Sequence, residues 1–161
     1  MKRDHQHTNL IWRVMGRMNQ RMASNYRRGI GPRQVVLLLT TTGRKSGLPR
    51  VTPLQYEQDG EVFYVASARG IQADWFRNVQ ANPQVQVQVG ERYLCGVAEA
   101  VTNPQRIADF LALRLKRHPL MIGMLMRLEG LPLRYTRQDL ERFAAQKAMV
   151  VIQPLPENPE L

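Results

Sequence analysis

The chain has 161 residues, a net charge of +10 at neutral pH and a hydrophobic fraction of 43%. This length and balance favour a single globular domain and exclude collagen, a coiled coil and a wholly disordered chain. The one cysteine, Cys95, excludes an intrachain disulfide and a metal site built from several cysteines. Because every apolar run is far shorter than the ~18 residues of a membrane span, we expect a cytoplasmic protein.

The positive charge is concentrated in the first third of the chain. Residues 1–50 contain 11 Lys or Arg residues and a single acid, whereas residues 51–161 contain 12 basic and 12 acidic residues. This asymmetry indicates an anionic partner: nucleic acid, an anionic membrane surface or a polyanionic small molecule. A solvated basic face without a partner is the competing explanation. Nucleic acid is the least supported partner, because few aromatic residues lie between the arginines.

Residues 1–30 are predicted to contain a basic amphipathic helix, from about Asn9 to Tyr26. One face is apolar and another carries arginines four residues apart; the positions are Ile11, Met15, Met18 and Met22, then Arg13, Arg17 and Arg21. The simplest expectation is that this helix docks on the core. It also suits a lid over a ligand site or a weak peripheral contact with the inner face of the membrane.

Residues 34–101 are predicted to form a β-barrel core. Strands are expected over residues 34–41, 50–56, 61–67, 84–89 and 92–101, with glycine-containing turns between them. A short helix is expected over residues 73–80. Cys95 lies in the alternating pattern of the last of these strands, where we expect it to be a small buried hydrophobe.

Residues 102–153 are predicted to be mostly helical. Asn103 and Pro104 give the start signal of a helix that is expected to end at His118. Further helical segments are expected over residues 120–128 and 137–145. A final strand is expected over residues 148–152, before a proline-rich tail at 154–161. The sum is an α+β fold: a largely antiparallel sheet or small barrel of five or six strands with peripheral helices.

The turn between the first two strands is the best candidate for an anion site. It brings together the side chains of Arg44, Lys45 and Ser46 with backbone amides freed by two glycines, and Arg50 lies on the strand that leaves it. These are the components of a phosphate or carboxylate cradle. The glycine spacing is wrong for a P-loop, and no helix follows. A basic turn on a solvated surface is the alternative.

Two further segments offer contacts to a flat ligand. Small residues at Ala66, Ser67 and Ala68 precede Arg69 at the end of the third strand, and Trp75 on the short helix could stack on a ring. Both patterns also suit packing alone. The sequence shows no catalytic triad, no carboxylate pair and no metal-ligand cluster, so we assign no catalytic side chain. An enzyme of this kind would rely on a bound cofactor.

Taken together, these segments resemble the deazaflavin (F420)-dependent nitroreductase family, whose split β-barrel is related to that of FMN-binding flavoproteins. The resemblance covers about residues 35–89. It is carried, in this order, by Gly43-Arg44-Lys45-Ser46-Gly47, Arg50-Val51-Thr52-Pro53-Leu54, Val65-Ala66-Ser67, Trp75, Asn78 and Ala81-Asn82-Pro83. It implies hydride transfer from reduced coenzyme F420 to an electron-poor acceptor such as an enone, a quinone or a nitroaromatic. Family members often carry Asn in place of Thr52 and Lys in place of Arg69.

The resemblance also implies which residues hold the cofactor. The anionic phosphodiester and polyglutamate tail would lie on the basic turn and its neighbour: Arg44, Lys45, Ser46 and Arg50. The second strand would line the ring and the ribityl chain through Val51, Thr52, Pro53 and Leu54. The third strand and the short helix would complete the site with Ala66, Ser67, Ala68, Arg69, Asp74, Trp75 and Asn78.

Two alternatives stay open on the sequence alone. The same fold could use FMN, or the protein could bind a flavin or a lipid-like ligand without turnover. The expected partners are a small-molecule electron acceptor and, by analogy with other split barrels, a second copy of the chain in a homodimer.

Overall fold

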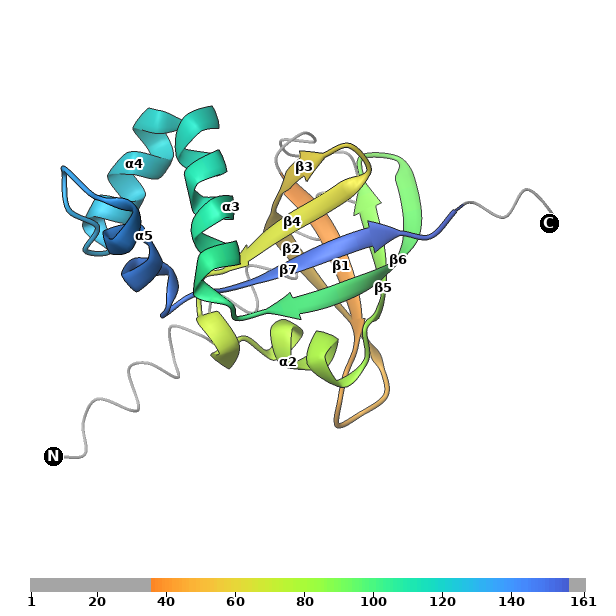
Figure 1. Ribbon diagram of the computed structural model, residues 1–161. Helices are drawn as coiled ribbons and strands as arrows, with labels where there is room; N and C mark the ends of the chain where they lie inside the picture. The colour runs from red at the N-terminus through yellow and green to blue at the C-terminus, as the bar shows by residue number, and fades with distance from the viewer. Residues whose placement is uncertain (1–35, 157–161) are drawn as a thin grey trace, which may run out of the picture.

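The computed structural model describes residues 36–156. The basic helix expected in residues 1–30 therefore lies outside the described residues. Figure 1 shows a curled sheet with a group of helices on one side. The strands of the described part are β1 (Val36–Thr42), β2 (Pro49–Gln55), β3 (Glu57–Asp59), β4 (Val62–Ser67), β5 (Gln84–Val89), β6 (Arg92–Val101) and β7 (Ala148–Pro154).

These strands form one sheet in the order β2-β1-β5-β6-β7-β4-β3, and every neighbouring pair is antiparallel. The sheet curls so that β2 and β4 approach each other. This confirms the α+β split-barrel class. The seventh strand is the three-residue β3, which lies between the strands expected over residues 50–56 and 61–67 and pairs with β4.

The helices are a short 3-10 turn η1 (Gly70–Gln72), α2 (Asp74–Ala81), α3 (Pro104–Arg117), α4 (Pro119–Leu128) and α5 (Arg137–Ala144). The start signal of α3 is confirmed, since the Asn103 side chain accepts a hydrogen bond from the Arg106 backbone N–H. A capping box between Thr136 and Asp139 opens α5. No helix of the described part of the chain is both long and apolar enough to cross a bilayer.

The strand β7 separates two apolar cores. Val150 and Ile152 face the barrel interior, together with Leu37, Leu39 and Phe76. The alternate residues of β7, Met149 and Val151, pack instead against α3, α4 and α5. Five consecutive residues of β7 are therefore buried, because each face of the strand serves a different core.

Cys95 is exposed, and the expectation that it is buried is wrong. Leu94 and Ala98 of β6 face the interior, so the intervening Cys95 points outward with Tyr93. The strand carries apolar residues in both phases of its alternation, which leaves the sequence ambiguous about which phase is buried. Packing in the barrel core, where Leu94 and Ala98 are buried, decides the phase.

A buried carboxylate connects β3 to the end of α3. Glu57 is 8% exposed, and its oxygens lie 3.5 Å from Arg114 Nε, 3.2 Å from Arg117 Nη1 and 3.2 Å from His118 Nε2. Because an isolated buried charge is costly, the carboxylate and the two guanidinium groups stabilise one another only in this arrangement. The cluster therefore fixes α3 over the edge of the barrel.

Replacing this carboxylate tests how firmly α3 is held. Glu57→Gln should lower the free energy of unfolding by about 3 kcal/mol, because it leaves Arg114 buried without its counter-charge. The matched control is Glu99→Gln, which removes the carboxylate of the exposed Glu99–Arg106 pair and should cost less than about 1 kcal/mol. Urea unfolding of both variants measures the difference, and equal losses would contradict the anchoring role of Glu57.

Candidate cofactor site

The basic turn between β1 and β2 is a closed loop. The Gly43 N–H donates to the Leu48 carbonyl at 2.8 Å, and the Gly47 N–H donates to the Gly43 carbonyl at 2.7 Å. Gly47 has a φ of +68°. A Cβ on Gly43 would approach Ser46 Oγ to 2.6 Å. The two glycines are thus required by the shape of the turn.

Arg44 clamps this turn to α2. Its Nη2 lies 2.9 Å from Asp74 Oδ1, and its Nη1 donates to Asn78 Oδ1 at 3.0 Å. The Arg44 backbone N–H donates to the same Asn78 oxygen at 3.2 Å. Asn78 Nδ2 in turn donates to the buried Thr41 Oγ1 at 3.2 Å. The polar groups of Arg44, Asp74 and Asn78 are therefore engaged with one another and hold the turn in place.

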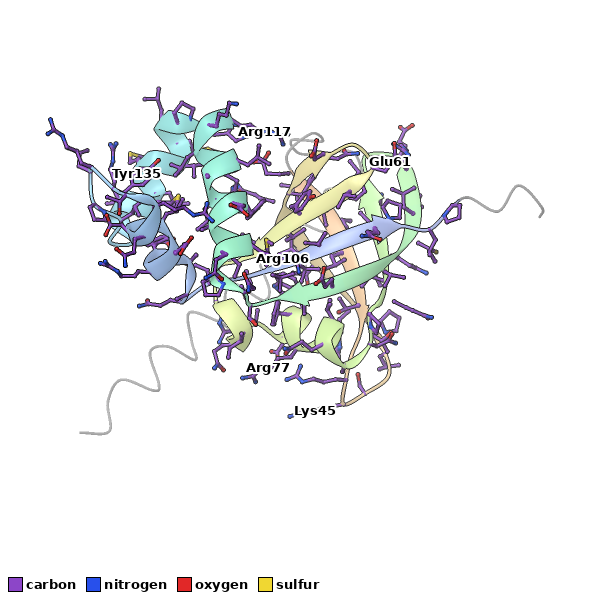
Figure 2. The ribbon with its side chains drawn as sticks, viewed as in Figure 1. Lys45, Glu61, Arg77, Arg106, Arg117 and Tyr135 are labelled. Atoms are coloured by element: carbon purple, nitrogen blue, oxygen red, sulfur yellow. The ribbon has the colours of Figure 1, made fainter. Side chains whose placement is uncertain are left out.

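Lys45 and Arg50 are left available by this clamp. Both side chains belong to exposed residues, and neither forms an ion pair with any residue between 36 and 156. Figure 2 shows Lys45 at the tip of the turn, at the same end of the barrel as Arg77. Ser46 Oγ accepts from the Leu48 N–H at 3.3 Å and remains at the surface. The turn thus presents two unpaired cations that suit an anionic group.

A pocket of about 850 Å³ lies between the barrel and the helices α3, α4 and α5. Its volume is within the range of cofactor and substrate sites. The barrel wall consists of Thr52, Pro53, Leu54, Gln55, Ala66, Ser67, Ala68, Arg69, Ala73, Asp74, Trp75 and Ala148. The helical wall consists of Ile107, Phe110, Leu111, Arg114, Ile122, Leu125, Met126, Glu129, Phe143 and Lys147.

The structure brings most of the predicted site residues to this pocket. The predicted residues that line it are Thr52, Pro53, Leu54, Ala66, Ser67, Ala68, Arg69, Asp74 and Trp75. Asp74 both lines the pocket and pairs with Arg44, so the basic turn adjoins the pocket. Val51 lies elsewhere, packed with Val36 and Leu38. The pocket thus borders β2 from Thr52 to Gln55 and does not reach Val51.

Two of the lining residues have defined local roles. Ser67 is buried, and its hydroxyl donates to the Gly70 carbonyl at 2.7 Å. Its oxygen can therefore only accept a hydrogen bond from a ligand. Trp75 is half-buried and packs edge-on against Phe76, with ring centroids 6.2 Å apart. The indole thus forms a stiff part of the barrel wall.

The helical wall was missed by the sequence analysis. The helical spacing of Ile107, Phe110 and Leu111 correctly indicates an apolar face, but spacing cannot show that this face borders a cavity. The sequence signal that could have indicated more is Arg114, a cation one turn beyond those residues. At this position a cation follows the apolar residues on the helix.

Arg114 has an unusual environment in this wall. Its side chain is 15% exposed, and its buried Nε–H has no hydrogen-bond acceptor among the described residues. Burial lowers the pKa of Arg114 below its ordinary value, and the nearby Glu57 carboxylate opposes this shift. The guanidinium carbon also lies 5.8 Å from the centre of the Phe110 ring. Arg114 thus brings a largely buried guanidinium, paired with Glu57, to the lining of the pocket.

The sequence of the chain matches a known protein family over most of its length. The family model described as F420H(2)-dependent quinone reductase matches residues 12–119 of the chain. The chain belongs to this family. The match confirms the F420-dependent family expected from the residues of the turn and the barrel wall, and the family's description gives a quinone as the acceptor.

Individual members are related over part of the chain. An F420H(2)-dependent quinone reductase of Mycobacterium tuberculosis is 39% identical over 59 residues, which are 35% of this chain and 40% of that protein. The chain thus matches well under half the length of this curated relative.

Solved structures support the fold of the family. One described as an F420-H2 dependent reductase has a TM-score of 0.50 and 22% identity, covering 74% of this chain and 95% of its own. The heme storage protein HutZ of Vibrio cholerae has a TM-score of 0.51 and 18% identity, covering 85% and 90%. The same barrel thus accommodates different ligands, and chemistry must be argued from the site.

The clamp on the basic turn can be tested through Asn78. Asn78→Ala should lower the free energy of unfolding by about 2 kcal/mol, because it leaves a backbone N–H and the buried Thr41 hydroxyl without their partner. Gln80→Ala, at an exposed position of the same helix, is the control and should change stability by less than about 0.5 kcal/mol. Urea unfolding compares the two. A loss at Asn78 no larger than that at Gln80 would contradict the clamp.

Proposed function

We propose that the protein is an oxidoreductase that uses reduced coenzyme F420 to reduce a quinone or another electron-poor acceptor. The observation that carries the proposal is the 850 Å³ pocket, whose barrel wall adjoins the basic turn and whose other wall is the largely apolar surface of α3, α4 and α5. Membership of the F420H(2)-dependent quinone reductase family supports F420 as the cofactor.

The residues present fit this cofactor. Lys45 and Arg50 would hold the anionic phosphodiester and polyglutamate tail by charge, since no described residue neutralises them. The clamp of Arg44 on Asp74 and Asn78 holds the turn that carries Lys45 against α2, whose Asp74 lines the pocket. A polyanionic tail suits this pair of cations better than the single phosphate of FMN does.

The flat part of the cofactor would lie along the barrel wall. Small side chains at Ala66 and Ala68 leave room for a ring next to the backbone at the end of β4. Thr52, Pro53 and Leu54 of β2 and Trp75 of α2 line the same pocket. When bound, reduced F420 supplies a hydride, and one further proton converts a quinone to a hydroquinone.

The residues of the chain would position the cofactor and the acceptor and would exclude water from the pocket. The helical wall covers the barrel wall with aliphatic and aromatic side chains, including Phe110, Leu111 and Met126. An acceptor between the two walls would lie against the face of the ring, where hydride transfer needs close contact. We assign no side chain as a general acid or base.

In the helical wall, we assign Arg114 the role of stabilising negative charge on the oxygen of the acceptor. It is a largely buried cation, paired with Glu57 through its Nε, on a wall of otherwise mostly apolar residues. Negative charge develops on a quinone or enone oxygen as it receives a hydride. A preorganised guanidinium stabilises such charge more strongly in a pocket that excludes water than it would in solvent.

Removal of one cation from the turn tests the cofactor part of the proposal. Lys45→Ala should weaken F420 binding about tenfold, as expected for the loss of one charge-assisted contact. Fluorescence titration with F420 at low and high salt measures the effect, and wild-type affinity should fall more steeply with salt than that of the variant.

The control for Lys45→Ala is Arg92→Ala, which removes an exposed positive charge from the first residue of β6. It should leave F420 affinity within about twofold of wild type. A surface charge that lies more than a Debye length from the bound cofactor contributes little to its binding. A parallel titration with FMN checks the cofactor itself. Unchanged F420 affinity in Lys45→Ala, or tighter binding of FMN than of F420, would contradict the proposal.

Arg114 can be separated from its structural partners by a matched pair of variants. Arg114→Met should raise the KM for a soluble quinone and lower kcat, so that kcat/KM falls about tenfold or more. The Kd for F420 should stay unchanged. Arg117→Met removes another guanidinium from the same Glu57 carboxylate but lies outside the pocket lining. Steady-state kinetics should show little change in Arg117→Met, and equal effects would reduce Arg114 to a purely structural role.

A homodimer stays a prediction of the family analogy. Light scattering of the purified chain measures it directly.

A further inference from the structure

An ion pair joins the end of α4 to the start of β7 at the edge of the pocket. Glu129 directly follows α4, and Lys147 immediately precedes β7. Their side chains form an ion pair, and both residues line the pocket. The Glu129 side chain is 41% exposed and that of Lys147 is 24% exposed. The pair thus lies at the rim of the pocket, with the ammonium on the more buried side.

The backbone of Lys147 is fixed without the help of this pair. Its N–H donates to the Ala144 carbonyl at the end of α5 at 2.9 Å, and the next residue, Ala148, pairs with β4 in the sheet. The ammonium also lies 4.8 Å from the centre of the Phe143 ring, where a cation is attracted to the aromatic face. Lys147 therefore lies between α5 and the barrel wall, and only its flexible side chain has to reach the acid.

The backbone of Glu129 is fixed as well. Its N–H donates to the Leu125 carbonyl at 3.2 Å, and the Leu131 N–H donates to the Met126 carbonyl at 2.9 Å. Leu131 is buried in the second core, so the chain that follows α4 is held in place. The positions of the two segments thus do not require the contact between the two charged side chains.

We propose that the Glu129–Lys147 pair limits the size of the electron acceptor. The pair bridges the end of α4 and the start of β7, so it closes the pocket between them. An acceptor that fits the closed pocket leaves the pair intact, whereas a larger one has to separate the two side chains. This assignment rests on the proposed function, which supplies the acceptor.

The burial of the two acids explains why this pair can open while the cluster at the other end of the helical wall cannot. The Glu57 side chain, which holds Arg114, is only 9% exposed, whereas that of Glu129 is 41% exposed. Water can replace the partner of an exposed charge, so partly exposed ion pairs are weak. The Glu129–Lys147 pair can therefore separate and re-form while the protein stays folded.

The accessibility of Trp75 tests the closure without cofactor or acceptor. Trp75 lines the pocket, and Trp12 is the other tryptophan of the chain, so Trp12→Phe leaves a single emitter. In that protein, Glu129→Ala should increase the quenching of Trp75 by acrylamide about twofold, because removal of a weak pair raises the open fraction moderately. High salt should raise the quenching of Trp12→Phe alone toward the same value, because salt screens the pair.

The matched control is Glu99→Ala, also in Trp12→Phe. It breaks the exposed Glu99–Arg106 pair, whose residues do not line the pocket, and should leave the quenching unchanged. The double variant Glu129→Lys with Lys147→Glu restores opposite charges and should return the quenching toward that of Trp12→Phe. Equal quenching in Glu129→Ala and Glu99→Ala would overturn the proposal. A loss of stability in urea without a change in quenching would do the same, since the pair would then be a structural contact only.

Acceptor selectivity tests the consequence for turnover. We compare kcat/KM for a water-soluble quinone of three fused rings with that for a quinone of one ring. This ratio should rise about fivefold in Glu129→Ala, the factor expected for removal of a weak pair, and should keep its wild-type value in Glu99→Ala. Turnover of both quinones with an unchanged ratio would overturn the proposal and leave the proposed function intact. Absence of F420-dependent turnover in the wild type would contradict the proposed function, and the Trp75 measurement would still decide whether the pair closes the pocket.

Discussion

The architecture depends on the insertion of β7 between β6 and β4. The chain leaves the sheet after β6, forms α3, α4 and α5, and must return to a central position in the same sheet. Both faces of β7 are buried as a result, one by the barrel interior and one by the helices. Because the helices are tied at both ends to adjacent strands, they cover the outer face of the sheet, and the pocket lies between the two layers.

The basic residues of the site serve two purposes, which composition cannot separate. Arg44 is engaged in holding the turn to α2 through Asp74 and Asn78, whereas Lys45 and Arg50 form no ion pair with any residue between 36 and 156. A similar division holds at the other wall. There Glu57 fixes the end of α3 through Arg114, Arg117 and His118, and Arg114 alone among them lines the pocket.

Much of the barrel could be predicted because its signals are local. Gly43 and Gly47 specify the turn, and the alternating Gln and Val residues of β5 specify one buried face. The burial of Cys95 was predicted wrongly, because β6 has apolar residues in both phases. The helical wall of the pocket was not predicted at all. Its residues show ordinary amphipathic spacing, and whether such a face meets a core or a cavity depends on what packs opposite to it.

The sequence by itself determined the antiparallel barrel, the basic turn and the family, since each rests on residues close together along the chain. Only the tertiary structure decided which cations have no ion-pair partner among residues 36–156, that Arg114 borders the pocket, and that the outer side of α4 is left exposed. The physical reason is the same in each case. Charge pairing and burial are set by contacts between residues 30 to 60 positions apart, such as Arg44 with Asp74 or Glu57 with Arg117, and no local pattern encodes those distances.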